Sequence, residues 1–213
     1  PLIGDIPPDC TPAHLGDLTS SGAWRNALDD EDRAALDDLA ARAPLPEDRC
    51  LVDDGWLRAD IGPWSGLWHV APGGWSPMPG HGHQDGGGFE IHYQGVPLFV
   101  DLGRGTYGDS GDAALYASAR VHNGLLVDDI DPYAPNRPYY DDTFRRSVGG
   151  APPVLERDGD AVQVRHSGYG RLKGVGAVGR QWRFTENGFS IADRVEGQGR
   201  RTIRRLLHTS LPV

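Results

Sequence analysis

From residue 50 onward the chain is divided into short apolar segments by turn-forming residues, and no sustained helical pattern crosses this region. The 213 residues include 30 glycines and 17 prolines, many of which lie between these segments. Glycine and proline interrupt regular structure and favour turns. Short strands at this spacing predict an all-β fold, and we expect a β-sandwich of antiparallel sheets.

Alternation of apolar and polar residues marks the individual strands. It is clearest in residues 55–60 and 87–93, and a Gln94-Gly95 turn leads from the second of these into residues 96–101. The other expected strands are residues 66–71, 124–127, 154–157, 162–166, 178–184, 189–195 and 202–208, with hairpin turn signals at residues 158–160 and 186–188.

The N-terminal part of the chain has a different pattern, irregular at first and then helical. We expect a helix from about residue 20, and a second helix that begins near Asp29, where a run of acidic residues suits a helix N-terminus. Pro44 and Pro46 end it. The expected organisation is a helical linker segment over residues 1–48 and a β-sandwich domain over residues 49–213. Cys10 and Cys50 could form one disulfide or remain two free thiols.

Charge and hydropathy restrict the classes of partner. The net charge of −9 argues against nucleic acid, because neutralising phosphates requires a basic surface. An acidic polysaccharide stays open, since a local cleft of arginine and histidine can oppose the overall charge. The mean hydropathy of −0.48 and the absence of a long apolar run predict no transmembrane span. The chain begins with Pro1 and shows no signal peptide, so we expect a piece of a longer protein and infer no compartment.

Histidines are concentrated between Pro79 and Asn123, where four of the eight occur. His81 and His83 are two residues apart, so on an extended strand both side chains leave the same face. Asp101 follows an apolar run, and His122 ends a further segment. Two imidazoles and a carboxylate are a common ligand set for Zn²⁺, and the neighbouring glycines allow close backbone approach. A pair of ordinary surface histidines is the alternative explanation of the HxH spacing.

Three blocks in this region carry a family resemblance: HGHQD at residues 81–85, PLFVDLG at residues 97–103 and RVHNGLLVD at residues 120–128. In this order and spacing they resemble the C-terminal β-sandwich domain of the heparinase II/III-like polysaccharide lyases, a group that includes heparinases and alginate lyases. The opening PLIGD also resembles the link that follows the helical domain in that family. The resemblance is strong over about residues 50–130 and looser outside it.

The resemblance implies a zinc ion bound by His83, Asp101 and His122, with His81 approaching the uronic acid of the substrate. It also implies a catalytic tyrosine near the cleft, for which Tyr107 is the first candidate and Tyr116 the competing one.

Further candidates for the substrate site are Arg104, Arg120 and Asn123. The two arginines could attract an anionic sugar or be ordinary surface residues. Asn123 could orient the neighbouring histidine or simply end a strand.

Lyases of this family perform β-elimination, in which a base removes the C5 proton of a uronic acid and an acid protonates the leaving oxygen. Neutralising the uronate carboxylate stabilises the developing carbanion. Family enzymes carry a catalytic tyrosine, with an asparagine or histidine, on an α/α-toroid that precedes the sandwich, and this chain has no room for one. We therefore expect a separate toroid domain to be needed for activity, and the isolated chain to be inactive.

Two other functions remain open. One is a non-catalytic carbohydrate-binding or structural zinc module. The other is an iron-dependent oxygenase, in which His83, Asp85 and His122 would form the facial triad. Tryptophans at positions 56, 64, 68 and 75 could stack on sugars, but aromatic residues in strands more often pack in the core. The acidic residues 128–131 are expected to form a solvated turn rather than a calcium site.

Overall fold

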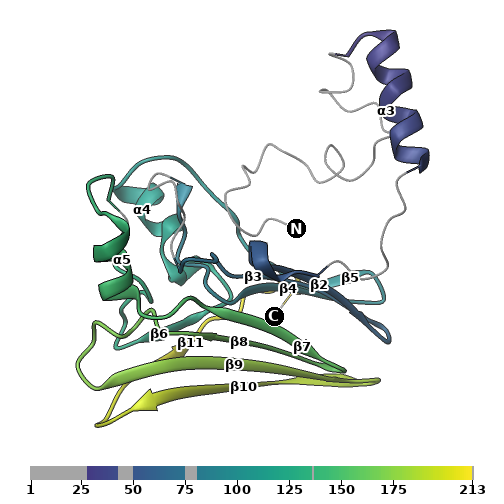
Figure 1. Cartoon of the computed structure of the whole chain (residues 1–213). Coiled ribbons are helices and arrows are strands. Elements are labelled where there is room, and N and C mark those ends of the chain that lie inside the picture. The colour runs from purple at the N-terminus through teal and green to yellow at the C-terminus, as the bar shows by residue number, and fades with distance from the viewer. Residues whose placement is uncertain (1–27, 43–49, 75–80, 136, 213) are drawn as a thin grey trace.

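The structure is a computed structural model that describes residues 28–42, 50–74, 81–135 and 137–212. Figure 1 shows two larger antiparallel sheets stacked as layers, which confirms the predicted β-sandwich. The first sheet has the order β1-β2-β3-β4-β5, the second β10-β9-β8-β7, and β11 pairs with β6.

The strands of the first sheet are β1 (Cys50–Leu51), β2 (Trp56–Ile61), β3 (Trp64–His69), β4 (Gly88–Tyr93) and β5 (Val96–Phe99). Those of the second are β7 (Val154–Asp158), β8 (Ala161–His166), β9 (Val175–Thr185) and β10 (Gly188–Gly197), and the remaining pair is β6 (Leu125–Val127) and β11 (Ile203–Arg205). The helical elements are α3 (Asp30–Arg42), η1 (Val52–Asp54), α4 (Gly111–Ala117), η3 (Ala119–Val121) and α5 (Asp142–Gly149).

The predicted turns join consecutive strands. Gln94 and Gly95 have φ angles of 50° and 82°, the backbone of a type I′ turn that suits the twist of the β4–β5 hairpin. Gly159, with φ of 58°, lies in the turn between β7 and β8. β9 extends beyond its predicted ends because pairing continues along β10, whereas β11 is shorter than predicted.

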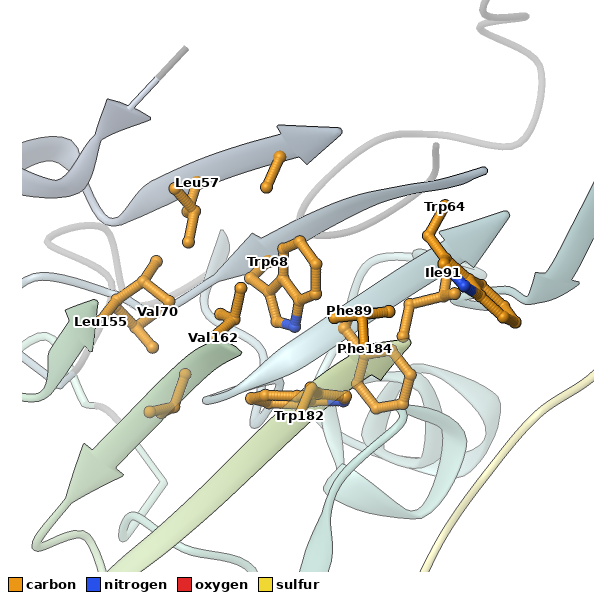
Figure 2. Packing of buried hydrophobic residues seen from close by; sticks show 12 residues of the cluster. Leu57, Trp64, Trp68, Val70, Phe89, Ile91, Leu155, Val162, Trp182 and Phe184 are labelled. Atoms are coloured by element: carbon orange, nitrogen blue, oxygen red, sulfur yellow. The ribbon is translucent and has the colours of Figure 1, made fainter. Parts of the chain in front are cut away.

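The core lies between the two larger sheets and combines large aromatic residues with aliphatic ones (Figure 2). The ring of Trp182 packs edge-on against Phe89 and Trp68, with centroids 5.1 and 5.9 Å apart. Gly66 leaves the space that the Trp68 indole fills, since a Cβ atom there would overlap the ring. Each large apolar side chain buried in this way contributes roughly 1.5–3 kcal/mol.

The core prediction for the tryptophans is confirmed for Trp64 and Trp68, whose side chains are 6% and 0% exposed. Trp56 is half-buried, with its ring centroid 4.2 Å from that of His69. Trp75 lies outside the described residues.

The predicted second helix of the N-terminal segment is confirmed as α3, and Asp29 Oδ1 caps it by accepting a hydrogen bond from the Asp32 amide at 2.9 Å. The helix expected from residue 20, Cys10 and the side chain of Cys50 lie outside the described residues. No helix in the described ranges is long and apolar enough to cross a membrane.

Two short helices, α4 and α5, are not predicted by the sequence pattern, and they lie at the same end of the sandwich (Figure 1). The sequence does carry the start of α5, because Asp141 Oδ1 accepts a hydrogen bond from the Phe144 amide at 2.7 Å. These helices and their flanking loops bring the candidate site together.

Candidate functional site

The centre of the candidate site is a buried ion pair between Asp101 and His122. Nδ1 of His122 lies 2.9 and 3.0 Å from the two carboxylate oxygens, and its Nε2 lies 3.0 Å from the carbonyl oxygen of Tyr116. Burial by itself lowers the pKa of His122, but the hydrogen bond and the charge of Asp101 outweigh it, so the pKa is raised. With an acceptor at each ring nitrogen, the protonated imidazole satisfies both contacts.

His83 lies over this pair. Its ring stacks on the ring of His122, with centroids 5.3 Å apart and planes at 27°. The next residue, Gln84, holds this loop in place, because its amide donates to Ala117 O at 2.9 Å and its Oε1 accepts from the Tyr133 amide at 2.9 Å. The end of α4 thus helps to position the histidine loop.

The three predicted zinc ligands are neighbours, but they do not converge on one point. Within the described ranges, no group of three His, Cys, Asp or Glu side chains is arranged to hold a metal ion. Two ligands about 2.0 Å from a tetrahedral zinc are roughly 3.3 Å apart, close to the 2.9 Å between His122 Nδ1 and Asp101 Oδ1. The chemistry of the donor set and the spacing of Asp101 and His122 therefore fit zinc.

Two further contacts fix the loop that carries Asp101. The Asp101 amide donates to Glu90 Oε1 at 3.3 Å, and Asp101 Oδ1 accepts from the Gly103 amide at 2.8 Å. Glu90 is itself 5% exposed and lies on β4. The carboxylate of Asp101 is thereby held at the end of β5, facing His122.

Asn123, a predicted substrate-binding residue, is completely buried. Its Nδ2 donates to Phe89 O at 2.8 Å and to Val100 O at 3.0 Å, while its Oδ1 accepts from the His208 amide at 2.7 Å. The side chain thus joins β4, the residue before Asp101 and the C-terminal segment, and it offers no surface to a ligand.

Arg180 is a buried residue of the site that the sequence interpretation overlooks. Its guanidinium donates to Asn123 O at 3.1 Å and Gly124 O at 3.3 Å, and its Nε donates to Asp193 Oδ1 at 2.6 Å. Asp193 also accepts from Arg205 Nε at 2.6 Å. The sequence does offer a signal for this role. Arg180 lies in the inward-facing row of β9, between Val178 and Trp182, where a buried charge requires a partner.

The exposed part of the site is formed by two other predicted residues, and a third, Arg104, packs against one of them. The rings of His81 and Tyr107 meet edge to face, with centroids 5.4 Å apart, and the guanidinium of Arg104 lies over the Tyr107 ring. His81 is exposed and Tyr107 is 62% exposed, whereas Arg104 is only 3% exposed. His81 and Tyr107 are therefore accessible to a ligand, whereas Arg104 is buried against the Tyr107 ring.

The other two candidates, Tyr116 and Arg120, make contacts of their own. The ring of Tyr116 packs against Gly105, and its carbonyl oxygen is the acceptor for His122. Arg120 is exposed, and its Nη2 donates to the carbonyl oxygen of Asp129 at 2.8 Å.

A cavity of about 800 Å³ opens beside Tyr107. Its lining includes His83, Gln84, Tyr107, Asp109 and Arg137. A deep part of the wall is Tyr133, which is 4% exposed and whose pKa is raised by burial, so its phenol stays neutral. Gly168 makes room for this ring, since a Cβ atom there would lie 2.9 Å from Tyr133 Cε2.

Asp85, the carboxylate of the oxygenase alternative, faces a different histidine. It is 4% exposed, and its Oδ2 lies 3.4 Å from His69 Nδ1. Burial raises the pKa of Asp85, but the charges of His69, His122 and His83 outweigh this and lower it well below its usual range. Direct contact with His122 thus belongs to Asp101, which favours the His83, Asp101 and His122 ligand set.

The acidic turn that follows β6 is partly exposed, in keeping with the expected solvated turn, and it is also held in place by ion pairs. Asp128 Oδ2 lies 2.7 Å from Arg201 Nη1, and Asp129 Oδ1 lies 2.9 Å from Arg204 Nη2. Asp131 Oδ1 accepts from Ser118 Oγ at 2.8 Å and from the Ala119 amide at 2.9 Å. The turn thereby becomes a fixed part of the cavity wall.

Solved structures similar to this chain include a heparan sulfate lyase and a heparinase III. One is the heparan sulfate lyase HepC from Pedobacter heparinus, with a TM-score of 0.58, 16% identity, and 93% of this chain and 30% of that chain covered. Another is a heparinase III with methylated lysines, with a TM-score of 0.54, 19% identity, and 79% and 25% covered. These identities show the fold alone, and the chain spans less than a third of either lyase.

No curated protein matches the chain. The family model described as "Heparinase II/III-like, C-terminal" matches residues 43–212, most of the chain. The match includes both sheets of the sandwich and every predicted site residue. The chain therefore belongs to the heparinase II/III-like family, matching its C-terminal domain.

Proposed function

We propose that this chain is a zinc-binding β-sandwich domain of a lyase that cleaves uronic-acid-containing polysaccharides by β-elimination. It would form one wall of the substrate cleft and act with a separate α/α-toroid domain. The observation that carries this proposal is that Tyr107, in contact with the exposed His81, and His83, stacked on His122 of the buried Asp101–His122 pair, line the same cavity. The lyase names of the similar structures support it.

His81 and Tyr107 can take different roles in the reaction. The His81 imidazole is exposed and can meet the uronate carboxylate, while the Tyr107 hydroxyl can take part in proton transfer. In β-elimination a base takes the C5 proton, the C4–O bond breaks, a C4–C5 double bond forms and an acid protonates the leaving oxygen. Arg104 packs against the ring of Tyr107 and would help to hold it at the cavity that it lines.

Zinc would be held by His83, Asp101 and His122, and when bound it supplies a rigid cross-link between the three loops. His81 is two residues from His83, so a fixed His83 also restricts the position of His81. Asn123 and Arg180 hold the backbone next to His122, and we assign them to positioning rather than to substrate contact.

The metal assignment is tested by two histidine variants that differ only in position. His83→Ala should lose bound zinc and lower the melting temperature, because it removes a ligand from the cross-link. His81→Ala should keep both zinc and stability, since its side chain is exposed. Elemental analysis and thermal melts measure the two effects. Equal zinc content in wild type and His83→Ala would refute the ligand assignment.

The catalytic part is tested with the protein that contains both the sandwich and the toroid. Incubation with uronate polysaccharides should produce unsaturated products that absorb in the ultraviolet, and His81→Ala and Tyr107→Phe should slow their formation. If the protein binds polysaccharide and zinc but forms no unsaturated product, the alternative of a non-catalytic module replaces the lyase proposal.

A further inference from the structure

We infer that an aromatic platform of Tyr139, Tyr140 and Phe144 is a carbohydrate-stacking subsite, which binds a sugar ring of the polysaccharide outside the cavity. The inference rests on the proposed function and adds a second point of contact with the same polymer. It concerns the segment that leaves the cavity wall at Pro138 and continues into α5. Its consequence is that affinity depends on the length of the polysaccharide.

The three rings of the platform pack together at the start of α5. The ring centroids of Tyr139 and Tyr140 are 4.9 Å apart with the planes at 81°, and those of Tyr140 and Phe144 are 4.2 Å apart. Tyr140 is half-buried, whereas Tyr139 is 77% exposed and Phe144 is 40% exposed. Asp141 fixes the backbone between them by accepting the hydrogen bond from the Phe144 amide. The platform is therefore held in place while it keeps an open ring surface.

The platform continues directly from the cavity wall. Arg137 and Pro138, which precede it in the chain, line the cavity together with Tyr107 and Asp109. Nη1 of Arg137 lies 3.9 Å from Asp109 Oδ2, so the platform segment meets the loop that carries Tyr107. The amide of Tyr140 donates to Arg137 O at 3.0 Å, which turns the chain from the cavity wall toward α5. A polymer that leaves the cavity past Pro138 reaches the platform next.

The chemistry of this segment matches a sugar of an acidic polysaccharide. One face of a pyranose ring carries mainly C–H groups, and packing it against an aromatic face removes both apolar surfaces from water. Arg137 adds a positive charge between the cavity and the platform, because its side chain is 44% exposed and its contact with Asp109 is long. Exposed ion pairs of this kind contribute little to stability, so a uronate carboxylate can compete with Asp109 for the guanidinium.

The exposed area of the platform suits a sugar better than a protein partner. A whole aromatic residue offers roughly 150–250 Å², so the exposed parts of the three rings together amount to about 300 Å². Each partner of a stable protein interface buries about 800 Å². The platform by itself is too small for such an interface, whereas the stacking of one sugar needs only one exposed ring, and Tyr139 provides it.

The test measures how affinity depends on chain length in the protein that contains both the sandwich and the toroid. The probes are a tetrasaccharide and a dodecasaccharide from alginate, and the same two lengths from heparosan, since both polymers contain uronic acid. Binding is measured by calorimetry in a Tyr107→Phe background, in which turnover of the probes is expected to be slow. Tyr139→Ala should weaken dodecasaccharide binding about fivefold, because one stacking contact is lost. Tetrasaccharide binding should stay unchanged, since the shorter probe is expected to occupy the cavity alone.

Two further variants assign the effect to the ring of Tyr139. Tyr139→Phe keeps the aromatic face and should bind the dodecasaccharide within about twofold of the parent affinity. Val96→Ala is the matched control, because it removes a 52% exposed apolar side chain from the β4–β5 hairpin and should change neither affinity.

Several results would overturn the inference. They are an unchanged dodecasaccharide affinity in Tyr139→Ala, equal losses at both lengths, and a parent protein that binds none of the four probes. Equal losses accompanied by a lower melting temperature or a changed oligomeric state would show that a protein surface, not a sugar, covers the platform. The lyase proposal is judged separately, from the unsaturated products of the wild-type protein. Absence of product together with an intact length effect overturns that proposal and leaves the subsite standing.

Discussion

Nδ1 of His122 lies within 3.0 Å of both carboxylate oxygens of Asp101, and both side chains are fully buried. The pair joins the end of the β4–β5 hairpin to the segment that leads into β6. It therefore connects the first sheet to the loops that carry the candidate site. We therefore expect a substitution in this pair to alter both the candidate site and the stability of the sandwich.

Asp101→Asn tests this dependence. The substitution removes the charge that balances His122, and breaking one side of a buried ion pair typically costs about 3 kcal/mol. We expect a drop of that size in the free energy of unfolding in urea without added metal. Asp109→Asn, at an exposed position, is the control and should change stability little. Wild-type stability in Asp101→Asn would show that the pair is not a structural link.

Asn123→Ala tests the role of Asn123 as a backbone brace. It removes three hydrogen bonds and leaves the carbonyls of Phe89 and Val100 buried without this donor. At about 1 kcal/mol for each bond, we expect a loss of about 3 kcal/mol in urea denaturation. Gln163→Ala removes an exposed hydrogen bond to Glu156 and should have little effect. A loss no larger than that of the control would contradict the bracing role and favour the earlier assignment of Asn123 as a substrate-binding residue.

The buried His166 should lower the stability of the folded protein in acid. Burial, aided by the charge of Arg180, lowers the pKa of His166 to about 4 from the usual 6.5. Between these values the unfolded chain binds a proton that the folded protein does not, so stability falls as the pH drops from about 6.5 toward 4. We expect His166 to account for about 2 kcal/mol of loss between pH 7.5 and pH 5. Urea denaturation at both values should show a smaller loss in His166→Gln, and an equal loss in the two proteins would contradict the assignment.

The turn of the β4–β5 hairpin holds Gln94 and Gly95 at positive φ, so substitutions there test backbone strain. Gln94 has a φ of 50°, which asparagine adopts more readily than glutamine, so Gln94→Asn should stabilise the protein by about 0.5 kcal/mol. Gly95→Ala places a side chain in open space at a φ of 82° and should destabilise it by about 1 kcal/mol through the backbone alone. Thermal melts measure both, and changes of the same sign would contradict the turn assignment.

The sequence alone predicted the sandwich because its signals are local. Alternation placed β2, β4 and β8 close to their observed ends, and Gln94-Gly95 gave the position of one tight turn, since side-chain periodicity and turn chemistry need no knowledge of distant residues. The sequence also singled out His81, Asp101 and His122, and the family resemblance added Tyr107. In the structure Asp101 contacts His122, and His81 contacts Tyr107.

Only the tertiary structure decided which of these residues a ligand can reach. Asn123 and Arg104 read as polar groups near a cleft, yet the first is fully enclosed by backbone partners and the second lies beneath Tyr107. Arg180 acquires its role from Asp193 and from the carbonyl of Asn123, 57 positions away. Burial and pairing between distant segments arise when the two sheets pack together, so a local pattern cannot contain them.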